Sequence, residues 1–356
     1  MKILIIQQKM IGDVLTSSIL FEALKKKYPK SELHYLINSH TYPVVENNPF
    51  IDKFIFFTPE MEKNKLKFYG FLKSIRREKY DAIVDVYGKL SSALITLFAK
   101  AKIKSAYYKK HTSFIFSNTF KRLTQPVNNA SLAVENRLKL LEPLKVEFTN
   151  ISTKIYLKND EIETSRHFLE THKIDLTNPL FMISVLGSTQ QKTYPLNYIA
   201  ELIDVIAEYK NSQILFNYIP KQEVDARKVY NYCKASTQKK IFFNVYGKSL
   251  REFLAITKHC SALIGNEGGA NNMAKALNIP TFTIFSPYLN KKNWFGEVET
   301  KTHVAIHLSD FIKFNEADRA NAKQNPEAYY LKLEPNFIKP QLNSFLSTLD
   351  KCNTSF

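Results

Sequence analysis

The fold of this chain is decided by residues 2–29, KILIIQQKMIGDVLTSSILFEALKKKYP. Residues 2–7 are a continuous aliphatic run of strand length, which is typical of a strand buried on both faces. Apolar side chains then recur at helical spacing from Gly12 to Tyr28, and Pro29 ends the helix. A strand, a tight turn and a helix in this order predict one unit of a parallel sheet covered by helices.

The alternation continues through two series. In the first, further strands are predicted at 33–37, 53–57, 81–86 and 103–108, with helices between them. In the second, which follows a hinge-like stretch around 145–160, strands are predicted at 180–186, 213–217, 240–244, 261–265 and 281–285. Right-handed crossovers between parallel strands cover both faces of a sheet with helices. The two series therefore predict an α/β fold with two doubly wound, Rossmann-like domains.

The length and composition support two domains, because 356 residues exceed the size at which a single core stops growing. We expect these domains at 1–155 and 156–335, and we expect the helical stretch at 336–356 to pack back on the first domain. The three cysteines lack the spacing of a disulfide framework or a zinc site. Neither a signal peptide nor a membrane-spanning run is evident. We therefore expect a cytoplasmic protein without a structural metal.

The formal net charge of +17 is concentrated in the first half of the chain. Residues 1–150 hold 25 Lys and Arg against 13 Asp and Glu, a net of +12. Solvated helix faces explain any single cluster of lysines, but together the clusters predict a positive field that attracts an anionic partner. Lys109 and Lys110 open a basic, aromatic, turn-rich segment at 109–132 that interrupts the alternation, and such segments often carry function.

Ligands of open parallel sheets bind beyond the carboxyl ends of the strands, so site residues are expected in the loops that follow strands. In the first such loop Gly12 permits a tight turn, and Asp13 stands at the start of the helix. Asp13 is either an ordinary helix cap or a general base within hydrogen-bond reach of an acceptor hydroxyl.

Two loops of the second series offer ligands for phosphate and ribose. The small and hydroxyl-bearing residues of the loop at 185–195 are Gly187, Ser188 and Thr189. Lys192 in the same loop supplies a point charge suited to phosphate. At the next helix start, Glu223 or its neighbour Gln222 is a candidate ligand for ribose hydroxyls, although an acidic residue there can equally serve the helix alone. The absence of Walker, GxGxxG and GxSxG patterns disfavours a P-loop enzyme, a dinucleotide enzyme and a serine hydrolase.

The loop at 265–277, GNEGGANNMAKAL, holds three of the nine glycines of the chain. Gly268 and Gly269 let the backbone approach a ligand closely, and the helix that follows presents N–H groups to a phosphate. A plain tight turn explains one glycine more easily than two beside a glutamate.

In this order the segments resemble those of glycosyltransferase family 9, the ADP-heptose:lipopolysaccharide heptosyltransferases and their relatives. The matching segments span nearly the whole chain: ILIIQQKMIGDVLTSSILFEALKKKYPKSELHYL (3–36), NNPFIDKFIFF (47–57), YDAIVDVYGKLSSALITLFAKA (80–101), ENRLKLLEPL (135–144), KTYP (192–195) and SLREFLAITKHCSALIGNEGGANNMAKALNIPTFTIFSP (249–287). The resemblance implies a GT-B fold, in which two Rossmann-like domains face an interdomain cleft. It also implies an inverting, metal-independent transfer of a sugar from a nucleotide diphosphate, with no cofactor.

The resemblance further implies roles for individual residues. Asp13 matches the proposed catalytic base of the family, Lys192 its diphosphate-binding lysine, and Ser188 with Thr189 its phosphate loop. The usual Asp-Ser/Thr-Gly-Pro-x-His reads here as Glu267, Gly268, Gly269, Ala270, Asn271 and Asn272. The carboxylate is therefore one methylene longer, and a hydroxyl and a histidine are lost. We expect this stretch to bind the donor, with Glu267 as a ligand for a sugar or ribose hydroxyl, and to mark where the donor sugar differs.

The implied acceptor is a lipid-linked anionic glycan such as the lipopolysaccharide core. We assign its binding to Gly12, Lys9, Lys109 and Lys110. The positive charge of the first domain and the aromatic loop that follows Lys110 predict peripheral docking on the inner face of the inner membrane. The apolar residues of that loop are Phe114, Ile115, Phe116 and Phe120.

Two other interpretations stay open at this point. One is a catalytically silent GT-B module that binds an anionic glycan or a membrane surface through its basic half. The other is nucleic-acid binding, which the net charge permits but for which the sequence shows no recognisable motif.

Overall fold

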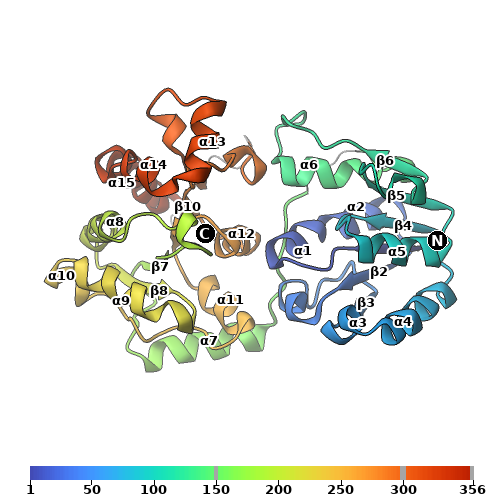
Figure 1. Cartoon of the computed structure of the whole chain (residues 1–356). Helices are drawn as coiled ribbons and strands as arrows, with labels where there is room; N and C mark the ends of the chain where they lie inside the picture. The colour runs from blue at the N-terminus through green and yellow to red at the C-terminus, as the bar shows by residue number, and fades with distance from the viewer. Residues whose placement is uncertain (148–150, 297–301, 353–356) are drawn as a thin grey trace. The chain divides into compact units, whose positions relative to one another are not determined.

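The computed structural model describes residues 1–147, 151–296 and 302–352 (Figure 1). The described residues divide into two compact units. The first unit contains residues 1–156 and regains the short segment 292–296, and the second contains the rest. The return of 292–296 to the first unit was not expected from the sequence, and it brings the single tryptophan of the chain into that unit.

The first unit contains a six-stranded sheet in which every pairing is parallel, in the order β3-β2-β1-β4-β5-β6. Its strands are β1 (Lys2–Ile6), β2 (Glu32–Ile37), β3 (Lys53–Phe56), β4 (Ala82–Asp85), β5 (Ile103–Tyr107) and β6 (Asn118–Phe120). Its helices are α1 (Ile11–Ser17), α2 (Ile19–Lys27), α3 (Pro59–Lys63), α4 (Lys65–Arg77), α5 (Leu90–Ala99) and α6 (Leu132–Lys139), with 3-10 turns η1 (Ser39–Val44), η2 (Ser113–Ile115) and η3 (Glu142–Leu144).

The core of the first unit lies on both faces of this sheet. On one face, Leu4 and Ile6 of β1 pack with the buried sides of α4 and α5, including Phe71 and Ile95. On the other face, Phe21 of α2 lies against Tyr35 of β2, with ring centroids 4.7 Å apart. The continuous aliphatic run of β1 is therefore buried on both faces, as predicted, because helices cover each side.

The second unit contains a five-stranded sheet, again parallel throughout, in the order β11-β10-β9-β7-β8. Its strands are β7 (Leu180–Ser184), β8 (Gln213–Asn217), β9 (Ala262–Asn266), β10 (Thr281–Ile284) and β11 (His303–Ile306). Its helices are α7 (Asn159–Thr171), α8 (Leu196–Glu208), α9 (Glu223–Tyr232), α10 (Ala235–Gln238), α11 (Leu250–Lys258), α12 (Gly269–Ala276), α13 (Glu316–Gln324), α14 (Pro326–Leu331) and α15 (Pro335–Cys352), with 3-10 turns η4 (Gln190–Lys192), η5 (Pro220–Gln222) and η8 (Leu308–Asp310). The 3-10 turn η6 (Lys291–Asn293) begins in the second unit and continues into the segment that belongs to the first. The prediction of two doubly wound α/β sheets is confirmed.

Three predictions of local structure are corrected. The expected strand at 240–244 makes a single bridge, Ile241 to Ile214, because the chain turns after Phe242, whose carbonyl accepts from the Val245 N–H at 3.1 Å. The short strands β6 and β11 were not predicted. The helix expected to pack back from 336–356 belongs to the second unit: α15 packs against α8, and Leu342 and Phe345 join that core. Residues 353–356 of that stretch lie outside the described residues.

Both sheets contain a point at which the strand order reverses, where neighbouring loops leave in opposite directions and ligands commonly bind. In the first sheet this point lies between β1 and β4, and in the second between β7 and β9. The loops that follow β4, β7 and β9 carry Lys89, Lys192 and Glu267, and Asp13 lies in the first turn of the helix that follows β1. Sheet topology therefore gathers the candidate residues of each unit at one place.

Candidate active site

Asp13 lies in the first turn of α1, but it does not cap that helix. The residue that precedes the helix is Met10, and no side chain caps it. Instead, Oδ1 of Asp13 accepts a hydrogen bond of 2.7 Å from Nη2 of Arg137. The Asp13 side chain is 37% exposed, so the carboxylate remains accessible to a substrate. Of the two interpretations of Asp13, the ordinary cap is excluded by this geometry.

Arg137 is held on several sides and therefore fixes the carboxylate. Its Nε donates to Oγ of Ser17 at 2.9 Å, and its Nη1 donates to the carbonyl of Ala133 at 2.8 Å. Its side chain is only 6% exposed. A planar guanidinium with this many fixed bonds holds its carboxylate partner in one orientation. The sequence pattern around Arg137 does not indicate this role.

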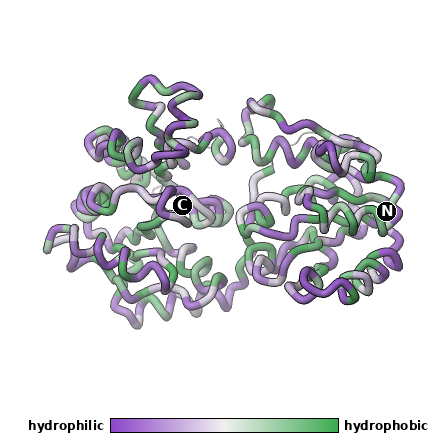
Figure 2. Tube along the Cα trace, viewed as in Figure 1, coloured by the Kyte–Doolittle hydropathy of each residue, from purple (hydrophilic) through white to green (hydrophobic). Residues whose placement is uncertain are grey.

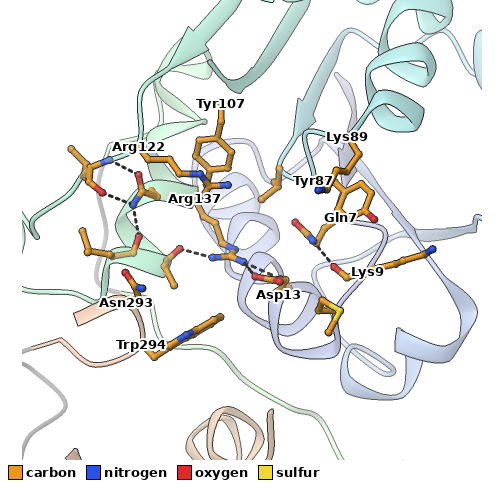
Figure 3. A pocket seen from close by; sticks show the side chains of 16 residues that line it. Gln7, Lys9, Asp13, Tyr87, Lys89, Tyr107, Arg122, Arg137, Asn293 and Trp294 are labelled. Atoms are coloured by element: carbon orange, nitrogen blue, oxygen red, sulfur yellow. Dashed lines mark hydrogen bonds and ion pairs between the residues drawn. The ribbon is translucent and has the colours of Figure 1, made fainter. Parts of the chain in front are cut away.

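A cavity of about 620 Å³ in the first unit opens beside Asp13 (Figure 3). Four cationic side chains line it: Lys9, Lys89, Arg122 and Arg137. The guanidinium of Arg122 lies over the ring of Tyr107, 3.6 Å from its centroid, which fixes the position of the cation. The indole of Trp294 lies at the rim, as Figure 3 shows. A cavity with cations and aromatic faces around one carboxylate suits an anionic, hydroxyl-rich ligand.

The four residues assigned to the acceptor from sequence differ in their relation to this cavity. Lys9 lines it and forms an ion pair of 2.8 Å with Glu62 of α3. Gly12 lies in α1 and accepts a hydrogen bond from Thr16. Lys109 donates to the carbonyl of Gly88, and Lys110 is exposed; neither lines the cavity. The cations that sequence analysis missed are Lys89, Arg122 and Arg137.

The loop that follows β4 is held by Asp85, a carboxylate that is completely buried. Its Oδ1 accepts from the Gly88 N–H at 2.8 Å, whereas Oδ2 has no partner among the described residues. Burial raises the pKa of Asp85 from its ordinary value of 3.8 to about 6. Asp85 therefore shapes the backbone that carries Tyr87 and Lys89 into the cavity wall, at a cost in stability near neutral pH.

Asp85→Asn is expected to raise the free energy of unfolding at pH 7 by up to about 3 kcal/mol, because the buried charge is removed and the bond to Gly88 is kept. In the wild type the folded state binds the proton more tightly than the unfolded state. The cost of the buried charge therefore disappears as the pH falls from about 6 towards 3.8. Urea unfolding of both proteins, at pH values from about 4 to about 7, measures the difference in their free energies of unfolding. A gain that does not change with pH would contradict this account.

In the second unit, Lys192 and Glu267 form an ion pair of 2.9 Å. Lys192 ends the short turn η4 after β7, and Glu267 follows β9, the neighbouring strand. Glu267 is nearly buried, with a side chain that is 7% exposed, whereas Lys192 is 29% exposed. The carboxylate therefore orients the ammonium group while leaving it accessible to an anion.

The loop around Gly187 has a shape that requires glycine. A Cβ at this position would lie 2.2 Å from the carbonyl oxygen of Lys192. The Gly187 N–H donates to Oγ1 of Thr193 at 3.0 Å, and Gln222 donates to the Gly187 carbonyl at 3.0 Å. Within this closed loop Ser188 and Thr189 are exposed. The loop thus exposes two hydroxyl-bearing side chains and also contains Lys192.

The stretch at 268–272 contains two glycines at the start of α12, with Gly268 as the residue that precedes the helix. A Cβ on Gly268 would meet nothing within 4 Å, so the protein itself does not require glycine there. Gly269 and Ala270 belong to the first turn, whose N–H groups are available to an anion. A ligand that approaches the backbone closely would need open space of this kind at the start of the helix.

Two asparagines of this stretch differ in their surroundings. Asn271 is buried, donates to the Asn266 carbonyl at 2.6 Å and accepts from Thr283 at 2.8 Å. Its side chain therefore joins β9 to β10, and only its backbone remains for a ligand. Asn272 is half-buried on α12. Glu223 is exposed in the first turn of α9, one residue after the Gln222 that bonds Gly187.

Gly268→Ala is expected to leave the free energy of unfolding within about 0.5 kcal/mol of the wild type, because the added methyl group meets no atom. The same methyl group should raise KM for the donor roughly tenfold if the ligand approaches the backbone there. Gly70→Ala, at an equally open position in α4, is the matched control. Urea unfolding and initial rates measure both effects; an unchanged KM would show that the donor lies elsewhere.

Comparison with known proteins places the chain among glycosyltransferases. A model of glycosyltransferase family 9 (heptosyltransferase) matches residues 68–330. Lipopolysaccharide heptosyltransferase 1 of Campylobacter coli is 25% identical over 313 residues, which cover 83% of this chain and 86% of that protein.

Two solved structures share the fold at low sequence identity. The glycosyltransferase family 9 protein of Veillonella parvula matches with a TM-score of 0.81 and 16% identity, over 98% of this chain and 96% of that one. ADP-heptose lps heptosyltransferase II of Escherichia coli matches with a TM-score of 0.74 and 16% identity, over 98% of this chain and 100% of that one. The prediction of a GT-B fold class is confirmed by these matches.

Proposed function

This chain belongs to glycosyltransferase family 9, the heptosyltransferase family, and we propose that it transfers a heptose or related sugar from ADP-heptose to the lipopolysaccharide core or a related cell-surface glycan. The relatives named for lipopolysaccharide and for ADP-heptose support this choice of substrates. The observation that carries the proposal is the pairing of Lys192 with Glu267 beside the start of α12, because it combines a cation, backbone N–H groups and a carboxylate.

The second unit is proposed to bind the donor. Lys192 and the N–H groups at the start of α12 bind the diphosphate, and Ser188 and Thr189 add hydroxyl donors to its oxygens. Glu267 accepts hydrogen bonds from hydroxyl groups of the sugar or ribose, in addition to orienting Lys192. Glu223, on an adjacent loop, is proposed as a further ribose ligand. These groups stabilise the negative charge that grows on the diphosphate as it leaves.

The first unit is proposed to bind the acceptor in the cavity beside Asp13. Arg122, Lys89 and Lys9 attract its anionic groups, and the acceptor hydroxyl donates to the Asp13 carboxylate. Arg137 holds that carboxylate in place through the bond of 2.7 Å. Gly12, Lys109 and Lys110 remain proposed contacts of the acceptor outside the cavity wall.

The proposed reaction is an inverting displacement at the anomeric carbon. The acceptor oxygen attacks this carbon from the face opposite the diphosphate, and its proton passes to Asp13. A glycosidic C–O bond forms as the C–O bond to the diphosphate breaks, and the nucleoside diphosphate leaves with the bonding electrons. No step of this scheme requires a metal ion or a cofactor.

A lipid-linked acceptor would place the enzyme at the inner face of the inner membrane. Among residues 1–147, 151–296 and 302–352, no helix is long and apolar enough to cross a bilayer. We therefore propose peripheral association with the membrane surface, which the net charge of the first half favours.

A screen of ADP-, GDP-, UDP- and dTDP-linked sugars tests the donor. Ligands that bind only the folded state raise the melting temperature, so an ADP-linked heptose should give the largest shift and should support transfer to a heptose-deficient core acceptor. A larger shift and turnover with another nucleotide sugar would replace ADP-heptose in the proposal. Binding and turnover with none of the donors would favour a catalytically silent module.

A further inference from the structure

The exposed side of α5 is unusually apolar for a helix at a protein surface. The helix Leu90–Ala99, LSSALITLFA, contains no charged residue. Its outward positions are Leu90, Ser91, Leu94, Leu97 and Phe98, and four of these five are apolar. Leu90 is 68% exposed and Leu97 is 42% exposed. A surface helix normally presents polar side chains to water, so this apolar stripe indicates an interaction partner.

Aromatic residues from neighbouring elements extend the stripe. Tyr69 of α4 is 49% exposed, and its ring meets that of Phe98 edge to face, with centroids 6.4 Å apart. On the other side, η2 packs against α5 and carries Phe114, which is 81% exposed. We call the set of Tyr69, Leu90, Leu94, Leu97, Phe98 and Phe114 the α5 surface. Figure 2 shows mainly hydrophobic residues along α5, whereas hydrophobic and hydrophilic residues alternate along α4.

This result corrects the expected docking loop. Of its four apolar residues, only Phe114 is fully exposed, because Ile115 is buried and Phe116 and Phe120 are half-buried. Phe114 therefore contributes to the α5 surface, but α5 itself, which sequence analysis read only as a sheet-covering helix, supplies most of the apolar area.

The elements around the α5 surface contain basic residues without acidic ones. Residues 86–134 include no Asp or Glu, but eight Lys and Arg. The helix α4 likewise contains no acid, and its five basic residues are Lys65, Lys67, Lys73, Arg76 and Arg77. The ammonium of Lys73 lies over the Tyr69 ring, 4.6 Å from its centroid. Exposed Lys89 and Lys100 stand at the two ends of α5.

We propose that the α5 surface is the face with which the first unit lies on an anionic phospholipid bilayer. Leu90, Leu97 and Phe114 enter the headgroup boundary, while the surrounding lysines meet lipid phosphates. The inference deepens the proposed function by naming the surface that contacts the membrane, and it rests on that function only because a lipid-linked acceptor gives the contact a purpose.

Charge favours a bilayer over a second copy of the chain as the partner. In a symmetric dimer the same surface meets itself, so the basic rim of one copy would face the basic rim of the other. Like charges placed opposite each other oppose such an association. An anionic bilayer complements both the apolar stripe and its rim.

Cosedimentation of the full chain with vesicles tests the proposal. We expect binding to equimolar phosphatidylcholine and phosphatidylglycerol, and little binding to phosphatidylcholine alone. Leu90→Ser/Leu97→Ser should weaken the binding roughly tenfold or more, because it removes apolar side chains that enter the bilayer. Lys65→Glu/Lys73→Glu should weaken it to a similar extent, because it removes attraction to the lipid phosphates. All four side chains are exposed, so both variants should melt like the wild type.

Matched substitutions in the second unit provide the controls. Val224→Ser/Leu331→Ser removes two exposed apolar side chains, and Lys239→Glu/Lys323→Glu reverses two exposed charges; neither should change vesicle binding. Equal binding by the α5 variants and the wild type would overturn the proposal. So would a wild-type dimer that the leucine variant converts to a monomer without any effect on vesicles.

The vesicles contain neither donor nor acceptor, so their binding does not depend on the proposed reaction. Transfer to an acceptor that lacks its lipid is measured separately and should be unchanged in Leu90→Ser/Leu97→Ser. If the leucine variant loses vesicle binding but keeps transfer, the result supports the α5 surface as the docking face. If the wild type binds vesicles but shows no transfer, the proposed function is overturned and the docking proposal stands.

Discussion

Asp13→Asn is expected to lower kcat for sugar transfer by about 100- to 10,000-fold, which is the usual contribution of a positioned general base. An amide cannot accept the proton of the acceptor hydroxyl as that hydroxyl attacks. The donor is bound by other residues, so the melting-temperature shift caused by the nucleotide sugar should persist. Initial rates at saturating donor and acceptor measure the loss.

Asp13→Asn is more informative than Asp13→Ala because asparagine can still bond to Arg137. Its guanidinium is 6% exposed and donates to Oδ1 of Asp13 at 2.7 Å. Asp13→Ala would leave this nearly buried cation without its partner, and the resulting instability would confuse the interpretation. The Oδ1 of asparagine can still accept the bond, so Asp13→Asn removes the basic group while keeping most of the surrounding structure.

Asp225→Asn is the matched control for this experiment. Asp225 also lies in the first turn of a helix, α9, and also forms an ion pair, at 2.8 Å with Lys228. It should retain wild-type kcat, since it has no part in either half of the proposed site. Transfer by Asp13→Asn at more than about a tenth of the wild-type rate would exclude Asp13 as the base.

Much of the fold was predictable because buried parallel strands carry strong signals. The runs of β1, β4 and β7 are short, mainly apolar and bounded by turns, so their pattern admits few alternatives. The strand expected at 240–244 has the same composition, but it lies beyond β8 at the end of the sheet. There, the backbone turn after Phe242 competes with ladder formation, and no local pattern reveals which one prevails.

The site was predictable where a residue directly follows a strand. Glu267 directly follows β9, and Asp13 lies in the first turn of the helix that follows β1. The ends of parallel strands meet at one edge of the sheet, so residues at these positions are brought to the site. Arg137 and Arg122 could not be found in this way, because they come from α6 and from the irregular segment before it. Trp294 enters the first unit only after four strands of the second, so its placement depends on a long-range return of the chain.

Topology also explains a result that residue chemistry alone did not anticipate. Sequence analysis assigned Lys192 to the diphosphate and Glu267 to a hydroxyl, as two independent ligands. Because β7 and β9 are adjacent, the two side chains pair at 2.9 Å. The role of either residue can therefore be measured only when the effect on the other is controlled.

Lys192→Gln is expected to lower kcat/KM for the donor by roughly 100-fold or more, because a cation that stabilises the departing diphosphate is lost. It should also lower the melting-temperature shift caused by the nucleoside diphosphate. The same change leaves Glu267, which is 7% exposed, without its counter-charge, so the free energy of unfolding should fall by about 1–3 kcal/mol.

The double variant Lys192→Gln/Glu267→Gln separates these two effects. With both charges removed, the stability should return towards that of the wild type, while kcat/KM stays low because the diphosphate still lacks its cation. Lys291→Gln is the control: Lys291 is a similarly exposed lysine of the second unit, paired with Asp310, and its loss should leave kcat/KM unchanged. Recovery of kcat/KM together with stability in the double variant would show that Lys192 serves the fold through Glu267 and does not bind the diphosphate.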